Sequence, residues 1–201
     1  MKRLSCSLIL LLTLTLTGLG LAGPAAACVG KTLTIGSTGS VQQDLLAEML
    51  SLLIGERTGT TVKVVRFPTT AAAHEALLKA DLDMFVEYTG AGQLEVLKGE
   101  PIADAGALFQ AVKARYNEEL NLVWLQPFGF DEPTAVKVAI PAQAAPVVRK
   151  DTLKKFPALS RLINKLGGTI DATTIHSLEA RAGKGNARDV ARDFLKSNRL
   201  I

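Results

Sequence analysis

The sequence is poor in the residues that most often build metal, disulfide and redox sites. Its 201 residues include two cysteines, two histidines and one tryptophan, and aromatic residues make up only 5%. Cys6 lies in an apolar N-terminal stretch that has the pattern of a signal peptide, as described below. Cys28 is therefore the single thiol of residues 28–201, and no internal disulfide is expected there. His74 and His176 are far apart and have no neighbours at ligand spacing, so we expect neither a metal site nor a cofactor.

Charge patterning and missing catalytic motifs exclude further classes. Lys and Arg number 23 against 19 Asp and Glu, and the two signs are interspersed without a basic run, which argues against a nucleic-acid partner. There is no Gly-x-Ser-x-Gly elbow, and a Cys–His pair is not available. The chain is therefore not expected to be an enzyme. A hydrolase that uses Asp83 or Glu87 is a minor alternative, since these acids alternate along one strand.

The N-terminus has the pattern of an export signal. A basic start (Met1-Lys2-Arg3) is followed by an apolar stretch from Leu8 to Leu21 and by small residues, Pro24-Ala25-Ala26-Ala27. This pattern predicts a signal peptide over residues 1–27 and an exported protein that is either periplasmic or lipid-anchored to a cell membrane. Cys28 follows three alanines, so it is either a lipid-attachment residue that anchors the protein to a membrane or an inert thiol of a free periplasmic protein.

The first half of the remaining chain alternates strands with helices. Apolar periodicity predicts this order along the chain: strand Lys31–Gly36, helix Val41–Leu53, strand Thr61–Phe67, helix Ala71–Ala80 and strand Leu82–Val86. Such a βαβαβ order implies a mostly parallel sheet with right-handed crossovers, and hence the α/β class.

The second half adds shorter strands and ends in helices. The elements expected there are helix Gly92–Leu97, helix Ala107–Leu120 with Leu108, Val112 and Tyr116 in line, strand Leu122–Leu125, extended pieces Thr134–Ile140 and Ala145–Arg149, helix Asp151–Leu166, a helix capped by Asp171, and helix Ala187–Ser197 with Val190 and Phe194 inward. Residues 28–201 are thus expected to form a single α/β domain with C-terminal helices.

Candidate binding residues follow the first and third strands. Ser37-Thr38-Gly39-Ser40 is a turn after the first strand, and Tyr88 comes directly after the third. Because ligands of open α/β sheets bind beyond the carboxyl ends of the strands, Thr38 and Tyr88 should open on one edge. An aromatic ring there can bind a cation such as a quaternary ammonium. The alternatives are a turn in which Ser37 or Ser40 only caps the helix, and a tyrosine that only covers the sheet end.

Three stretches carry a family resemblance. They resemble the glycine betaine/choline-type substrate-binding proteins of ABC transporters. The stretches are LTIGS…QQDLLAEMLSLLIGERTG, HEALLKADLDMFVEYTGAG and QAAPVVRKDTLKKFPALSRLINKLGGTID…ARDVARDFLKSNRLI. E-Y-T-G is the most specific piece. The resemblance implies a periplasmic-binding-protein-like fold, a quaternary ammonium ligand and an ABC permease as partner.

The chain departs from this family in ways that bear on the site. Family members have two lobes that close over the ligand, and the second lobe is expected to be missing here, near residues 140–143. Tyr88 matches the first-lobe tyrosine, whereas Thr134 stands where a second tyrosine is common. Thr38 replaces a lysine in the first turn, and Ala91 replaces the threonine that ends Y-T-G-T.

These comparisons define the expected function and site. The expectation is a solute-binding component of an ABC-type glycine betaine/choline uptake system, with weak or altered binding. The alternative is an interaction protein whose open sheet edge binds a second copy or another exported protein. The residues expected at the ligand site are Ser37, Thr38, Tyr88, Thr89, Gly90, Ala91 and Thr134.

Overall fold

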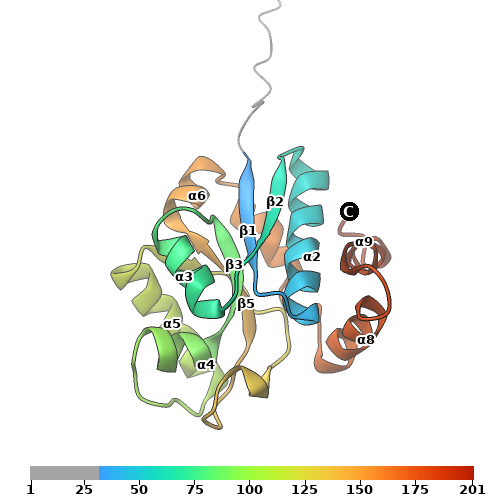
Figure 1. The fold of residues 1–201 in the computed structure, drawn as a ribbon. Helices are drawn as coiled ribbons and strands as arrows, with labels where there is room; N and C mark the ends of the chain where they lie inside the picture. The colour runs from blue at the N-terminus through green and yellow to red at the C-terminus, as the bar shows by residue number, and fades with distance from the viewer. Residues whose placement is uncertain (1–31) are drawn as a thin grey trace, which may run out of the picture. The chain divides into compact units, whose positions relative to one another are not determined.

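The computed structural model describes residues 32–201 (Figure 1). The expected signal peptide, residues 1–27, and the expected lipid attachment at Cys28 lie outside the described residues. Within residues 32–201, none of the helices combines the length and the apolar character that crossing a membrane requires.

The described part contains one sheet of five strands in the order β2-β1-β3-β5-β4. The strands are β1 (Leu33–Ser37), β2 (Val62–Arg66), β3 (Met84–Tyr88), β4 (Leu122–Trp124) and β5 (Ala144–Arg149). β1 pairs in parallel with β2 and β3, while β5 lies antiparallel between β3 and β4. All the strands except β5 therefore run in one direction, which confirms the predicted mostly parallel α/β sheet.

Helices cover both faces of this sheet (Figure 1). One face carries α2 (Val41–Thr58), α8 (Ala172–Ala182) and α9 (Ala187–Ser197), and the other carries α3 (Thr70–Leu78) and α5 (Ala105–Glu119). The predicted stripe Leu108, Val112 and Tyr116 is fully buried against the second face. Val190 and Phe194 face inward as predicted.

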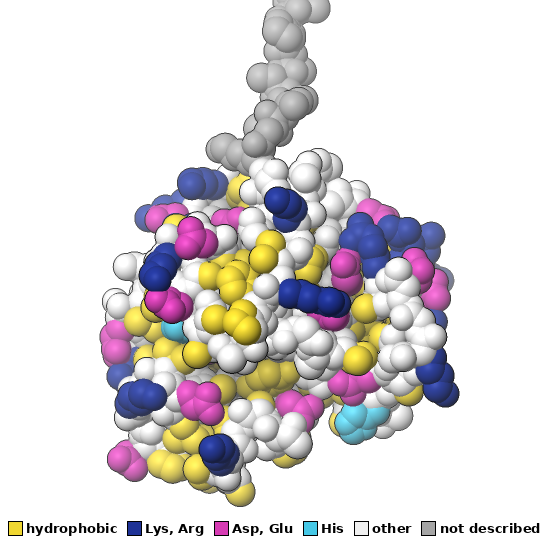
Figure 2. All heavy atoms as spheres, in the orientation of Figure 1, with side chains coloured by type: hydrophobic (Ala, Val, Ile, Leu, Met, Phe, Trp, Pro, Cys, Tyr) yellow, Lys and Arg dark blue, Asp and Glu magenta, His cyan; other side chains and the backbone are white. Residues whose placement is uncertain are grey.

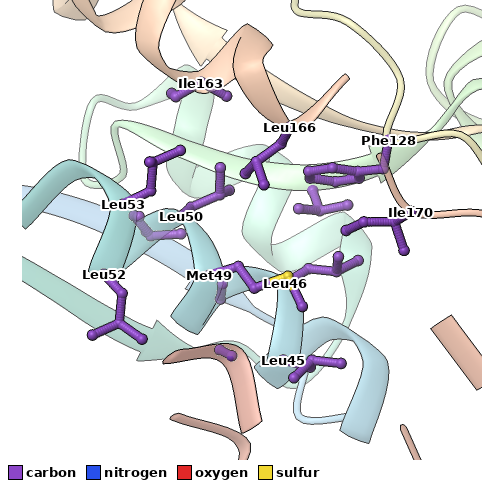
Figure 3. Packing of buried hydrophobic residues seen from close by; sticks show 14 of the residues in the cluster. Leu45, Leu46, Met49, Leu50, Leu52, Leu53, Phe128, Ile163, Leu166 and Ile170 are labelled. Carbon is purple, nitrogen blue, oxygen red and sulfur yellow. The ribbon is translucent and has the colours of Figure 1, made fainter. Parts of the chain in front are cut away.

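Helix α2 is buried around most of its circumference (Figure 3). Its leucines and Met49 pack on the sheet, on Phe128 and on the C-terminal segment around Leu166. The Ser40 side chain caps its start, and Gly59, with φ of 69°, ends it in the left-handed conformation that glycine adopts without strain. Val41, in the first turn of α2, is 43% exposed.

Two predicted elements differ in the structure. Residues 134–140 do not form a strand: Pro133–Ala135 is a short 3₁₀ turn (η2), and an extended pairing occurs only at the Asp131–Gln143 bridge. The predicted helix Asp151–Leu166 is three shorter elements. These are α6 (Lys150–Lys155), α7 (Leu159–Ile163) and the 3₁₀ turn η3 (Asn164–Leu166). Pro157 explains the break between α6 and α7, because proline has no backbone N–H to donate to a helical hydrogen bond.

The chain after β3 turns immediately into a helical segment. α4 (Thr89–Ala91) continues into the π-helical turn η1 (Gly92–Val96), close to the predicted short helix 92–97. Tyr88 is thus the last residue of a strand and the residue that begins a helix, which fixes its side chain at the carboxyl edge of the sheet.

Candidate functional site

A pocket of about 270 Å³ lies at the carboxyl ends of β1 and β3. We call it the Tyr88 pocket. Its walls come from the β1–α2 turn, the first turn of α2, the end of β3, the segment around η2, and α8. The lining residues are Thr38, Ser40, Val41, Gln42, Gln43, Tyr88, Glu132, Thr134, Ala135 and Glu179.

Two glutamines fix the hydroxyl of Tyr88. The hydroxyl donates to Gln42 Oε1 at 2.5 Å and accepts from Gln43 Nε2 at 3.1 Å. Gln43 Nε2 also donates to the carbonyl of Val86, so its amide is anchored to β3. Burial raises the pKa of Tyr88 to about 12. The phenol is therefore neutral at physiological pH, and its ring has a fixed position in the pocket wall.

Two carboxylates accept hydrogen bonds from the side-chain amide nitrogen of Gln42. Its Nε2 donates to Glu132 Oε2 at 3.0 Å and to Glu179 Oε1 at 2.9 Å. Neither glutamate forms an ion pair with a cationic side chain within residues 32–201. Burial raises the pKa of Glu132, but hydrogen bonds from Thr134 and Gln42 outweigh this effect and hold it below its ordinary value. The pocket thus places negative charge beside an aromatic ring.

Three of the sequence-predicted residues meet in this pocket. Thr38, Tyr88 and Thr134 all line it, although they lie on different segments. Thr134 donates its hydroxyl to Glu132 Oε1 at 2.5 Å, so it positions that carboxylate. The arrangement can attract a cation, because both carboxylates lie beside the Tyr88 ring.

Ser37 and Thr89 do not line the Tyr88 pocket. Ser37 is fully buried, donates to Asp44 Oδ1 at 2.6 Å and accepts from the Gly39 nitrogen, so it stabilises the turn. Ser40 is the residue that caps α2, as one alternative proposed. Thr89 is also fully buried, and its hydroxyl accepts from the Gln143 nitrogen at 3.0 Å.

Gly90 and Ala91 also lie outside the lining of the Tyr88 pocket. A Cβ added to Gly90 would lie 2.9 Å from the carbonyl of Pro141. Ala91 packs with Val136 and Ala142 in a small apolar cluster. Both residues therefore pack against the loop 133–141, and they affect the Tyr88 pocket only through the position of that loop.

Sequence reasoning missed the polar side chains of the pocket. Gln42 and Gln43 lie in the first turn of α2, directly after the turn 37–40 that the sequence analysis had selected, and this position was a signal that could have found them. Glu132 stands two positions before Thr134. Glu179 carried no signal, because it is 137 positions from Gln42 and reaches it only through the packing of α8 beside α2.

The remaining candidate groups have other roles. Asp83 accepts from the Thr34 nitrogen at 2.9 Å and from the Thr152 hydroxyl at 2.7 Å, so it joins β1, β3 and α6. Among the described residues, no group of three or more His, Cys, Asp or Glu is placed to hold a metal ion. His74 lies in a different pocket, on the opposite face of β3.

Comparison with protein families identifies a matching family model over most of the described residues. The family described as the substrate binding domain of ABC-type glycine betaine transport system matches residues 31–139 and 131–197. The two matched segments overlap at 131–139, around the loop described above.

Curated relatives resemble only part of this chain. The ergothioneine transport permease/ergothioneine binding protein EgtU of Helicobacter pylori is 30% identical over 117 residues, which are 58% of this chain and 21% of that protein. The carnitine transport binding protein OpuCC of Listeria monocytogenes is 28% identical over 127 residues, which are 62% of this chain and 38% of that protein. The matched segments thus span well under half the length of either relative.

Solved structures share the fold. A glycine betaine/carnitine/choline ABC transporter structure superposes with a TM-score of 0.78 at 17% identity, covering 85% of this chain and 98% of that one. Apo YehZ from Escherichia coli gives a TM-score of 0.74 at 18% identity, covering 86% and 100%. At such identities the likeness concerns the fold, which is that of periplasmic-binding-protein-like domains.

Proposed function

Because the chain belongs to the family of substrate-binding domains of ABC-type glycine betaine transport systems, we propose that it binds a small quaternary ammonium solute in the Tyr88 pocket and delivers it to an ABC permease. Members of this family are binding proteins and not enzymes. The observation that carries the proposal is the Tyr88 ring, held by two glutamines beside Glu132 and Glu179.

The chemistry of the pocket suits a cation without N–H groups. A quaternary ammonium cannot donate conventional N–H hydrogen bonds, so it is held by an aromatic face and by diffuse negative charge. One aromatic wall contributes about 0.5–2 kcal/mol. A partly solvated carboxylate a few ångströms away adds on the order of 1–4 kcal/mol before desolvation. These terms support weak binding, with a dissociation constant of roughly millimolar order.

Weak binding also fits the proposed absence of a second lobe near residues 140–143. The segments around 128–132 and 142–146 lie side by side: Phe128 donates to the Ala144 carbonyl at 3.0 Å, and Glu132 donates to that of Ala142 at 2.9 Å. Only the short loop 133–141 joins them. The two overlapping segments of the family match support an interruption at the same place. Residues 28–201 would then be one complete lobe with its ligand edge open.

The proposal includes export. Residues 1–27 would direct the chain across the inner membrane, and the protein would act in the periplasm. Cys28 would be either its lipid anchor or a free N-terminal thiol. Labelling with a fatty-acid analogue in cells, compared between the unaltered chain and Cys28→Ala, separates these two forms.

Titration calorimetry with glycine betaine, carnitine and choline tests the binding function. We expect Tyr88→Ala to abolish the heat of binding, and the pair Glu132→Gln with Glu179→Gln to weaken it about tenfold. The matched control is Glu119→Gln, an exposed glutamate paired with Arg115 on α5, which should bind like the unaltered chain. Absence of heat with all three solutes at millimolar concentration, or binding that survives Tyr88→Ala, would refute the proposal.

A second candidate function is docking of a second copy of the chain on the open edge. Its support is Val41, an apolar side chain that is 43% exposed and lines the Tyr88 pocket. Sedimentation at micromolar concentration decides: a dimer that Val41→Asp dissociates would support docking, and a monomer would exclude it.

A further inference from the structure

A second pocket, of about 350 Å³, lies on the opposite face of β3. We call it the Glu87 pocket, after the carboxylate at its floor. Apolar side chains from α3, η1 and the end of α5 line its walls, and Glu75 and Glu95 stand exposed at its mouth. Figure 2 shows hydrophobic side chains gathered over α3 on this side of the molecule, with acidic and basic side chains around them.

The floor of the Glu87 pocket contains buried polar atoms that have no hydrogen-bond partner within residues 32–201. Glu87 is fully buried, and its Oε1 accepts from the Tyr116 hydroxyl at 3.1 Å. Its Oε2 has no hydrogen-bond partner among residues 32–201. His74, only 7% exposed, has its Nδ1 3.6 Å from Glu87 Oε1, beyond a hydrogen bond, and neither ring nitrogen has a partner in the same part of the chain.

Neighbouring rings hold these groups in place. The His74 ring makes edge contacts with Phe85 and Tyr116, at 6.3 and 5.7 Å between centroids. Tyr116 in turn contacts Trp124 at 5.3 Å. Burial and the nearby Glu87 carboxylate raise the pKa of Tyr116, so its hydroxyl stays a donor. Because a buried carboxylate normally receives several donors, the unpartnered Oε2 of Glu87 in the lining of a pocket points to a ligand that supplies a donor.

We propose that the Glu87 pocket binds a protonated aliphatic primary amine. The ammonium N–H groups would donate to Glu87 Oε2 and to a ring nitrogen of His74, while the alkyl chain would lie along the apolar walls. The lining contains three glutamates and no arginine or lysine, so its charge excludes an anionic ligand. A diamine would bind more tightly than a monoamine, because its second ammonium group reaches the carboxylates at the mouth of the pocket.

The Glu87 pocket and the Tyr88 pocket thus differ in the cation they select. The Tyr88 pocket offers a ring and suits a cation without N–H groups. The Glu87 pocket offers unmet acceptors and needs N–H groups. This inference does not depend on the proposed transport function, since it uses other residues on the other face of the sheet.

Calorimetry with three probes of equal chain length tests the proposal: pentylamine, diaminopentane and pentyltrimethylammonium. We expect diaminopentane to bind more tightly than pentylamine, and pentyltrimethylammonium to bind at this pocket at least about tenfold more weakly than pentylamine. Glu87→Gln should weaken amine binding about tenfold or more, while Glu119→Gln should leave it unchanged. Tyr88→Ala should also leave amine binding unchanged, which separates this site from the Tyr88 pocket.

Imidazole NMR of the unaltered chain provides a test that needs no variant. Pentylamine should shift the ring resonances of His74, with those of His176 as the internal reference, and pentyltrimethylammonium should not. The proposal is overturned if His74 does not respond to amines, if it responds equally to both cations, or if Glu87→Gln folds and binds amines normally. In each case the floor groups would be satisfied by internal water.

Discussion

Glu87 and Tyr88 are consecutive residues of β3, yet their side chains reach opposite faces of the sheet. Glu87 accepts from Tyr116 of α5, whereas Tyr88 donates to Gln42 of α2. The alternation of side chains along a strand requires this separation. A single dipeptide therefore supplies the carboxylate of one pocket and the aromatic wall of another, and each can be altered without touching the other.

Both tyrosines of the chain should resist ionisation in the folded state. Burial raises the pKa of Tyr88 to about 12, and burial with the nearby Glu87 raises that of Tyr116. The sequence has two tyrosines in all. Phenolate absorbance should therefore stay low up to about pH 11 in the folded protein, and both tyrosines should titrate near pH 10 in concentrated guanidinium chloride.

The same shift makes stability depend on alkaline pH. The unfolded chain loses the Tyr88 proton first, so the stabilisation is present below about pH 10 and is lost as the pH rises towards 12. The shift of Tyr88 amounts to up to about 3 kcal/mol of unfolding free energy over that window. Urea unfolding of Tyr88→Phe should show a shallower decline than the unaltered chain. Full ionisation of one tyrosine near pH 10 in the folded protein would contradict this prediction.

Gly92 should not tolerate a side chain. A Cβ there would lie 2.9 Å from Trp124 and 3.0 Å from the Tyr116 hydroxyl, both fully buried. We expect Gly92→Ala to lower the unfolding free energy by about 1–3 kcal/mol through overpacking. The control is Gly55→Ala within α2, where the nearest atom is 3.6 Å away and alanine should stabilise the helix by up to about 1 kcal/mol. Equal effects of the two changes in urea unfolding would refute the packing argument.

Local patterns were sufficient for much of the fold. Ser40 and Gly59 cap α2 as their residue types indicate, and the strand ends placed Thr38 and Tyr88 on one edge. Alternating apolar residues at 134–140 were misleading, because a strand also needs a partner strand. Within residues 32–201, the pairing beside this segment is limited to the isolated bridge between Asp131 and Gln143. The contact between Gln42 and Glu179 could not be predicted, since it depends on how α8 packs beside α2.

The loop 133–141 should be dispensable for folding but not for the Tyr88 pocket. Replacing it with Asn-Gly keeps the backbone pairing between Glu132 and Ala142 and suits a tight hairpin. It removes Thr134 from the pocket and Val136 from its small apolar cluster. We expect a loss of about 1–2 kcal/mol of stability, or ~2–8 °C in Tm, and loss of choline binding. Unfolding that is no longer cooperative in calorimetric scans would contradict a merely connecting role.

Asp83 should contribute far more to stability than Asp81, although both precede β3. The Asp83 carboxylate accepts from the backbone of Thr34 and from the hydroxyl of Thr152, which is 1% exposed. Asp83→Ala leaves both donors without this acceptor, and each loss costs about 1–3 kcal/mol. Asp81 is exposed, and its side chain forms no hydrogen bond within residues 32–201, so Asp81→Ala should cost less than about 0.5 kcal/mol. Urea unfolding of the two variants measures the difference. Similar losses of unfolding free energy for the two variants would contradict the prediction, because the hydrogen bonds from Asp83 to β1 and α6 would then add little to stability.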